Sequence, residues 1–214
     1  MVVDANVTKV AAGINHTLFI KKDGSLWAMG KNHQGYLGDG STTNSATPVR
    51  VVDANVTDVA PGSSHSAFLK ENGSLWVMGY NNVGQLGDGT NTKRLSPIQV
   101  VDANVTAIAA GSHQTFYRKS DGSLWAMGSD HHGALGLGEP IFYATPYKAV
   151  DANVTDASFG DQHVLFVDNN ESLWGMGRKN RIGFFNGSSY ATSPTKIQSG
   201  GVSDPEGGYL LSMF

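Results

Sequence analysis

The chain has 214 residues, no cysteine, a formal net charge of -3 and a charged fraction of only 15%. These figures exclude disulfides and thiolate metal sites, and without a basic block we expect no nucleic-acid partner. No stretch approaches the run of about 20 apolar residues that crosses a membrane, so we expect no membrane partner, and the first six residues are not typical of a signal peptide.

The first half of the opening unit predicts a turn and two strands. Residues 3–8 are typical of a turn, and residues 7–12 alternate apolar and polar side chains before Gly13. Residues 17–21 are rich in β-branched and aromatic types, which favour a strand. Asp23-Gly24 then predicts a hairpin.

The second half of the unit predicts two further strands around a long loop. Residues 25–30 carry apolar side chains on both faces, so we expect this strand to be covered on both sides. A glycine-rich loop follows over residues 32–40, with glycines where positive φ or close approach is expected. Pro48 then precedes a final edge strand over residues 49–51.

The same pattern recurs along the whole chain. Gly-Ser-Leu-Trp-x-Met-Gly, or Glu-Ser-Leu-Trp-x-Met-Gly in the last copy, places the only four tryptophans 49 residues apart. Such a period predicts a repeat architecture. We expect an all-β fold: a β-propeller-type array of four-stranded antiparallel blades, with about four and a half repeats of 49 residues and no helix. The single domain 1–214 comprises units 1–49, 50–98, 99–147 and 148–199 and a partial unit 200–214.

These motifs in combination resemble the repeat of the regulator of chromosome condensation family. The matching phrases are Val-Ala-Ala-Gly-x-x-His-x-x-Phe, Asp-Gly-Ser-Leu-Trp-Ala-Met-Gly and Asn-x-x-Gly-x-Leu-Gly-Asp-Gly, over residues 1–200. The resemblance implies a propeller, most often of seven blades. Members include an exchange factor for a small GTPase, an ultraviolet receptor and an inhibitor of β-lactamase, so the scaffold does not fix a function.

The chain departs from that pattern in three places. It has four full units, Gln114 stands where the other units have His16, His65 and His163, and the fourth long loop keeps only part of the motif. Asn169-Asn170-Glu171 also replaces the Asp-Gly hairpin, which predicts a different turn in the fourth unit.

None of the candidate residue groups predicts a catalytic or metal-binding site. We interpret Trp27, Trp76, Trp125 and Trp174 as interior packing residues, and His16, His65 and His163 as structural side chains whose rings bond to a neighbouring backbone group. His113, His131 and His132 could bind a transition metal, but no further ligand completes a set. The Gly-Asp-Gly loops supply one carboxylate per unit, which fits turn chemistry better than a cation site. We therefore expect no cofactor, no metal and no enzyme activity.

Up-down blade topology places the first-to-second and third-to-fourth connections at one end of every blade. The sequence at this end varies between the units, whereas the hairpin end is nearly identical. We therefore expect a protein partner, whose identity is unknown, to bind at the variable end. Neutral drift of exposed loops is the alternative explanation of the variation. The residues are Ile14, Asn15, His33, Gln34 and Tyr36, then Ser63, Ser64, Asn82, Val83 and Gln85, then Ser112, His113, His131 and His132, then Asp161, Gln162, Arg181 and Phe184.

Closure of the array is a separate question. Four and a half units are too few for a ring of seven, and both the first unit and the apolar tail 209–214 would present uncovered sheet. Either the chain closes on itself, or two chains cover each other about a two-fold axis. We favour the homodimer, which makes a structural or self-assembly unit the alternative function.

Overall fold

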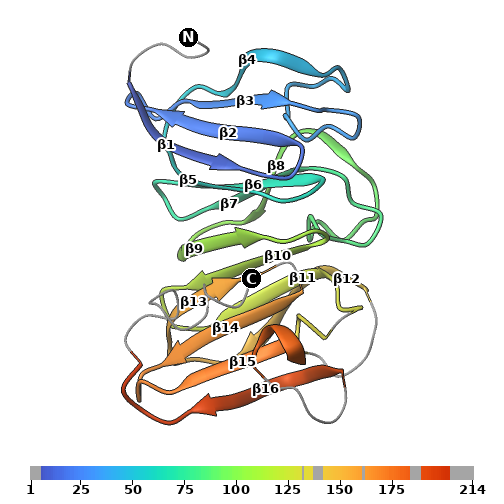
Figure 1. Ribbon diagram of the computed structural model, residues 1–214. Coiled ribbons are helices and arrows are strands. Elements are labelled where there is room, and N and C mark those ends of the chain that lie inside the picture. The colour runs from blue at the N-terminus through green and yellow to red at the C-terminus, as the bar shows by residue number, and fades with distance from the viewer. Residues whose placement is uncertain (1–5, 132, 137–141, 161, 184–188, 203–214) are drawn as a thin grey trace.

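The computed structural model describes residues 6–131, 133–136, 142–160, 162–183 and 189–202. Four antiparallel sheets of four strands follow one another, with the first sheet at the top of Figure 1 and the fourth at the bottom. The predicted all-β, propeller-type array is confirmed, and each sheet is one blade. His132, Asp161, Phe184 and the apolar tail lie outside the described residues, as does the predicted half-unit beyond residue 202.

Each blade runs through its strands in sequence order. The first contains β1 (Val7–Ala12), β2 (His16–Lys21), β3 (Leu26–Gly30) and β4 (Ser45–Val52), and the second contains β5 (Val56–Pro61), β6 (His65–Lys70), β7 (Leu75–Gly79) and β8 (Arg94–Val101). The third contains β9 (Val105–Ala110), β10 (Gln114–Lys119), β11 (Leu124–Ser129) and β12 (Phe142–Val150). The fourth contains β13 (Val154–Phe159), β14 (His163–Asp168), β15 (Leu173–Arg178) and β16 (Tyr190–Gln198).

The final strand and the fourth long loop differ from the sequence expectation. The fourth strand of each blade begins before its proline: β4 starts at Ser45, and Pro48 lies where the pairing with β3 shifts register, so the proline occupies an irregularity instead of the strand start. A short 3-10 helix, η1 (Lys179–Arg181), stands in the fourth long loop, where no helix was expected.

The Asp/Asn-Gly-Ser-Leu-Trp phrase is explained by a chain of hydrogen bonds at the first three hairpins. In the second unit Trp76 Nε1 donates to Ser74 Oγ at 2.9 Å, and Ser74 Oγ donates to Asn72 Oδ1 at 2.6 Å. Gly73 has φ +74°, and its N–H closes the turn on Lys70 O. The motif therefore ties the tryptophan to the turn that precedes it.

The fourth hairpin keeps the same turn, so the prediction of a different one is wrong. Glu171 N–H donates to Asp168 O at 3.0 Å, the counterpart of the Gly73 bond, and Glu171 has φ +57°. Asp168 Oδ2 accepts directly from Trp174 Nε1, which replaces the serine relay. The surrounding strands impose the turn, and a non-glycine residue takes the left-handed conformation.

The core lies between successive blades. Leu18, Leu26 and Ala28 of the first blade pack against Val59, Phe68 and Met78 of the second, and equivalent clusters join the second to the third and the third to the fourth. Both faces of an inner blade are therefore covered, as the two-sided apolar pattern predicts.

The tryptophans pack at the edge of these clusters. Each indole is half-buried, since one of its faces stacks on an aromatic ring of the neighbouring strand and a lysine ammonium lies over the ring. In the second blade Trp76 stacks on Phe68 at 6.1 Å, with Lys70 Nζ 4.3 Å from the ring centre. We expected interior positions, but the indoles bridge the core and the surface.

Candidate binding surface at the loop end of the blades

The two connections predicted to share one end of each blade do lie side by side. Lys31 N–H, at the start of the first long loop, donates to Asn15 O at 2.9 Å, and Tyr80 N–H repeats this bond to Ser64 O. The Asp23 hairpin follows at the far end of β2. The predicted strand order is therefore confirmed, and we name this end, with residues 13–15, 31–44 and their equivalents, the loop end.

The opposite end is uniform for a structural reason. Val56, Val105 and Val154 each donate a backbone N–H to the hairpin glycine of the preceding blade at 3.0 Å. The asparagine before each of these valines has positive φ, which Asn tolerates better than most residues. A side chain at these hairpin glycines would meet the next blade, since a Cβ at Gly24 would lie 2.7 Å from Asn55 N, which accounts for the uniform glycine in the first three hairpins.

Asn32 and Asn81 organise the long loops. Asn81 is fully buried; its Oδ1 accepts from Leu86 N–H at 2.9 Å, and its Nδ2 donates to Asp88 Oδ1 at 3.0 Å. Asp88 also pairs with Arg94 at 2.6 Å. The aspartate of the Gly-Asp-Gly phrase therefore stabilises the conformation of the loop. Among the residues that the structure describes, no three His, Asp or Glu side chains gather in a way that could hold a metal ion.

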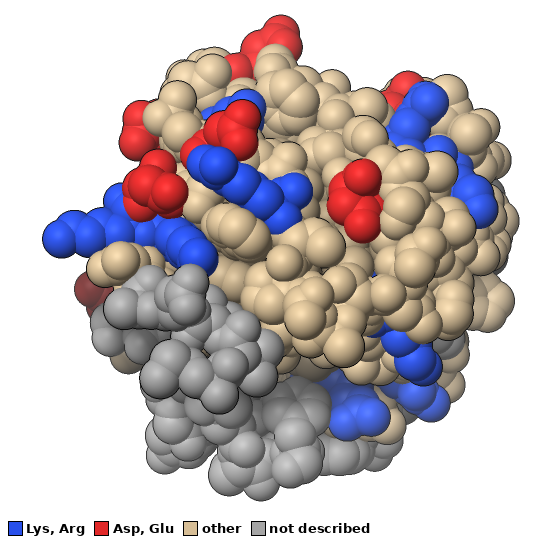
Figure 2. All heavy atoms as spheres, turned by 90° about the horizontal axis from the view of Figure 1, so that it is seen from above, with Lys and Arg blue, Asp and Glu red and all other residues tan. Residues whose placement is uncertain are grey.

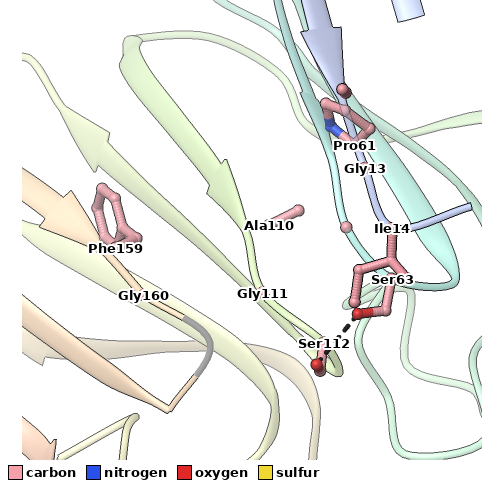
Figure 3. Close-up of a pocket in the computed structure, with 11 residues that line it drawn as sticks. Gly13, Ile14, Pro61, Ser63, Ala110, Gly111, Ser112, Phe159 and Gly160 are labelled. Atoms are coloured by element: carbon pink, nitrogen blue, oxygen red, sulfur yellow. Dashed lines mark hydrogen bonds between the residues drawn. The ribbon is translucent and has the colours of Figure 1, made fainter. Parts of the chain in front are cut away.

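A shallow groove marks where the first connections of successive blades meet. It has a volume of about 330 Å³ and runs past Gly13, Gly62, Gly111 and Gly160 at the ends of the innermost strands. Figure 3 shows Ile14 and Phe159 at opposite sides of it and the bond between Ser63 and Ser112, whose Oγ atoms are 3.0 Å apart. The groove therefore brings together predicted residues from separate units.

The predicted surface residues that the structure describes fall into three groups by exposure. Ile14, His33, Asn82, His113, His131 and Arg181 are exposed, and Asn15, Gln34, Ser63, Ser64, Val83, Ser112 and Gln162 are half-buried. Tyr36 and Gln85 are buried, at 8% and 0% exposure, which contradicts their place on the surface. Their side chains are enclosed because the backbone carbonyl of each bonds the next blade, from Ser66 Oγ at 2.8 Å and Thr115 Oγ1 at 2.7 Å.

His16 and His65 join neighbouring blades, and each bonds a side-chain hydroxyl instead of the backbone group that was expected. His16 Nε2 lies 2.7 Å from Ser66 Oγ, whose own hydrogen is donated to Tyr36 O, so the histidine must donate from Nε2. His65 Nε2 stands in the same relation to Thr115 Oγ1 at 2.9 Å. Burial lowers the pKa of His16 to about 4 and that of His65 to about 3, which keeps both rings neutral at pH 7.

The histidine-to-hydroxyl bond is absent between the third and fourth blades, because both of its residues are replaced. Gln114 replaces the histidine and bonds within its own blade, from Nε2 to Ser129 O at 3.0 Å. Val164 stands where the fourth blade would present the hydroxyl and is fully buried. The sequence showed the glutamine, but the paired loss of the hydroxyl became visible only once the blades were placed together.

Charge does not single out a nucleic-acid surface on the part of the molecule in view. Figure 2 looks onto the first blade, where acidic and basic side chains alternate around a broad uncharged area. Within the described residues, no helix has both the length and the apolar character needed to cross a membrane.

Comparison with known proteins agrees with this geometry. The sequence model of the regulator of chromosome condensation (RCC1) repeat matches residues 23–69, 72–117 and 121–167, and a second model of the repeat matches residues 7–35 and 56–85. Among curated protein sequences, none matches the chain.

Similar solved structures are propellers of the same kind. Human WBSCR16 is 22% identical with a TM-score of 0.79, over 89% of this chain and 52% of its own. Prp20p from Saccharomyces cerevisiae, studied for its binding to Gsp1p and histones, is 20% identical with a TM-score of 0.81, over 92% and 52%. Yeast RCC1 (Prp20) bound to Kap60 is 21% identical with a TM-score of 0.80, over 92% and 50%. The chain thus spans about half the length of these proteins, and the likeness establishes the fold.

Proposed function

The chain belongs to the regulator of chromosome condensation (RCC1) repeat family, and from that premise we propose that it is a non-catalytic module that binds a protein partner at its loop end. One similar protein, yeast Prp20, is described with protein partners, namely Gsp1p, histones and Kap60. The observation that carries the proposal is that the loop end differs in sequence between the units, whereas the hairpin end is nearly identical, on one array of four-stranded blades. A rigid scaffold with varied loops is a common basis for recognition.

The composition of the loop end favours a protein over a nucleic acid. Its exposed side chains mix Ile14, His33, Asn82 and Arg181, so apolar, amide and cationic groups are interleaved. The net charge of -3 gives no long-range attraction toward phosphate.

Affinity capture from an extract of the source, with matched variants, tests this proposal. The loop-end variant replaces His33, Asn82 and His131, which occupy the same exposed position in three successive blades, by alanine. The control replaces Asp53, Asp102 and Asp151, equally exposed at the uniform end, by alanine. We expect the loop-end variant to lose a partner that the control retains. Retention by both variants, or loss by the control alone, would reject the loop end as the docking surface.

Self-assembly is a second candidate, because the outer face of the first blade is exposed. Val7 and Val10 are 41% and 65% exposed, whereas their counterparts Val56 and Val59 in the second blade are 4% and 5% exposed. A second copy could cover this face about a two-fold axis. Light scattering after size-exclusion chromatography tests it: a mass near twice 22.6 kDa supports the homodimer, and a mass near 22.6 kDa rejects it.

A further inference from the structure

The groove at the ends of the innermost strands is built from the same short stretch of every blade. The lining residues are Ala12, Gly13 and Ile14, then Pro61, Gly62 and Ser63, then Ala110, Gly111 and Ser112, then Phe159 and Gly160. Because all four blades contribute, an occupant of the groove contacts several units at once. A volume of about 330 Å³ that is shared among four blades forms a strip across the loop end, which fits an extended chain better than a compact ligand.

Glycine backbone forms the floor of the groove. A Cβ at Gly13 would lie 2.5 Å from Gly62 O, and one at Gly62 would lie 2.5 Å from Gly111 O, so the packing of the blades keeps side chains out. The N–H groups of all four glycines are donated within their own blades, for example from Gly62 to His65 O at 2.9 Å. The floor is therefore fixed in place, and its glycine N–H groups are not available to an anion.

Two bulky apolar side chains stand at opposite sides of this floor, as Figure 3 shows. Ile14 is 74% exposed, whereas the second and third units have Ser63 and Ser112 at the same position. Phe159 is half-buried and stacks on Phe116 with 5.1 Å between the ring centres, where the other units have alanine or proline. Exposed apolar groups of this kind are typical of contact sites for another protein.

Hydroxyl groups occupy the middle of the groove. Ser63 Oγ donates to Ser112 Oγ at 3.0 Å and keeps lone pairs that can accept a hydrogen bond. None of the described residues that line the groove is charged, so a charged side chain placed there would lose water without gaining an opposite charge. The lining therefore favours uncharged, apolar side chains, together with a main-chain N–H directed at Ser63.

We propose that this groove binds an extended, uncharged segment of a partner protein. The apolar side chains of the segment contact Ile14 and Phe159, and its backbone crosses the glycine floor beside Ser63. This inference rests on the proposed function, since it identifies the part of the loop end that makes the contact and the chemistry of the partner's segment. Ile14 is the main anchor, because it passes from largely exposed to covered on binding.

A phage-displayed library of random linear peptides supplies the probe, and the full chain is the target. The selected peptides are synthesised, and fluorescence anisotropy measures their Kd values. I14S is the test variant, because serine stands at this position in the second and third units and the fold accepts it there. V10S is the matched control, since Val10 is 65% exposed on the same blade and does not line the groove.

We expect the selected peptides to carry apolar residues and no net charge. I14S should weaken their binding about ten- to hundredfold, as expected when the burial of one isoleucine side chain is lost, and I14D should weaken it further. V10S should leave the Kd unchanged. Amide NMR shifts on titration with a selected peptide should concentrate at residues 12–14, 61–63 and 110–112.

Equal binding of the selected peptides to I14S and to the unchanged chain would reject the groove, as would peptides whose binding requires a charged side chain. A library that yields no peptide above the background of an unrelated protein would reject an extended segment as the occupant. A mass that falls from twice 22.6 kDa to 22.6 kDa in I14D would assign the groove to a second copy and overturn the proposal.

The capture experiment at the loop end separates this inference from the proposed function. The variant of His33, Asn82 and His131 used there changes no residue that lines the groove. A captured partner that is lost by that variant but retained by I14D would leave loop-end binding intact and refute the groove. A partner that is lost by I14D and retained by V10S would support both.

Discussion

His16 and His65 each donate from Nε2 to a hydroxyl of the following blade and leave Nδ1 buried without a partner in the described residues. Protonation at Nδ1 therefore places an unpaired charge between blades. The pKa of each ring is lower in the folded protein than its ordinary value of about 6.5, so between pH 6.5 and 4 the unfolded chain binds more protons than the folded one. Stability is complete above pH 6.5 and falls as the pH drops.

We expect the free energy of unfolding to decrease by about 1.4 kcal/mol per histidine for each pH unit below 6.5. Urea titrations at pH 7, 5.5 and 4.5 measure it. The double variant H65Q/T115V copies the pairing of Gln114 with Val164 and should have a smaller pH slope. An unchanged slope would mean that other groups control the acid response.

Glu171 occupies a left-handed turn position that holds glycine in the other three units. A non-glycine residue pays a conformational penalty there, so E171G should stabilise the protein by about 0.5–1 kcal/mol, after the greater chain entropy of glycine is subtracted. The reverse change, G73E, should destabilise it, because a Cβ at residue 73 would lie 2.9 Å from Asn104 N. Denaturant midpoints of both variants decide this, and a loss of stability in E171G would contradict it.

At the scale of the element, each long loop depends on one buried amide. N81A removes the acceptor of Leu86 N–H and the donors to Asp88 and Thr90, and leaves buried groups unpaired. We expect a loss of about 1–3 kcal/mol for N81A. N82A, at the exposed neighbouring position, should change stability by less than about 0.5 kcal/mol. Equal effects of the two variants on thermal unfolding would show that the loop does not rely on Asn81.

The strands, hairpins and loop ends were predictable because their signals are local. Asp23-Gly24 and the alternation of residues 7–12 act within a few residues, and the 49-residue period repeats each signal. The bond from His16 to Ser66 crosses 50 residues, so no local pattern announces it. The burial of Tyr36 and Gln85 likewise depends on the next blade, and Glu171 takes its turn conformation from the strands around it.

At the scale of the whole molecule, a blade gains stability from its neighbours, as in other repeat arrays. Strand β5 contacts both the first and the third blade. Strand β1 contacts a neighbouring blade, the second, on one face, and Val7 and Val10 of β1 are exposed. The rate of amide hydrogen exchange depends on how readily a strand opens locally, so it distinguishes a strand with two neighbouring blades from a strand with one. We therefore expect amides of β1 to exchange faster than those of β5 in dilute solution.

The dependence of amide exchange on protein concentration distinguishes a homodimer from a ring closed within one chain. If two copies cover each other's first blade, protection of β1 rises with protein concentration while protection of β5 stays constant, because only β1 gains a neighbour on association. Hydrogen exchange followed by mass spectrometry over a dilution series measures both strands in one sample. Protection of β1 equal to that of β5 at every dilution would mean that the first blade is already covered within a single chain, and would reject the homodimer in favour of a self-closed ring.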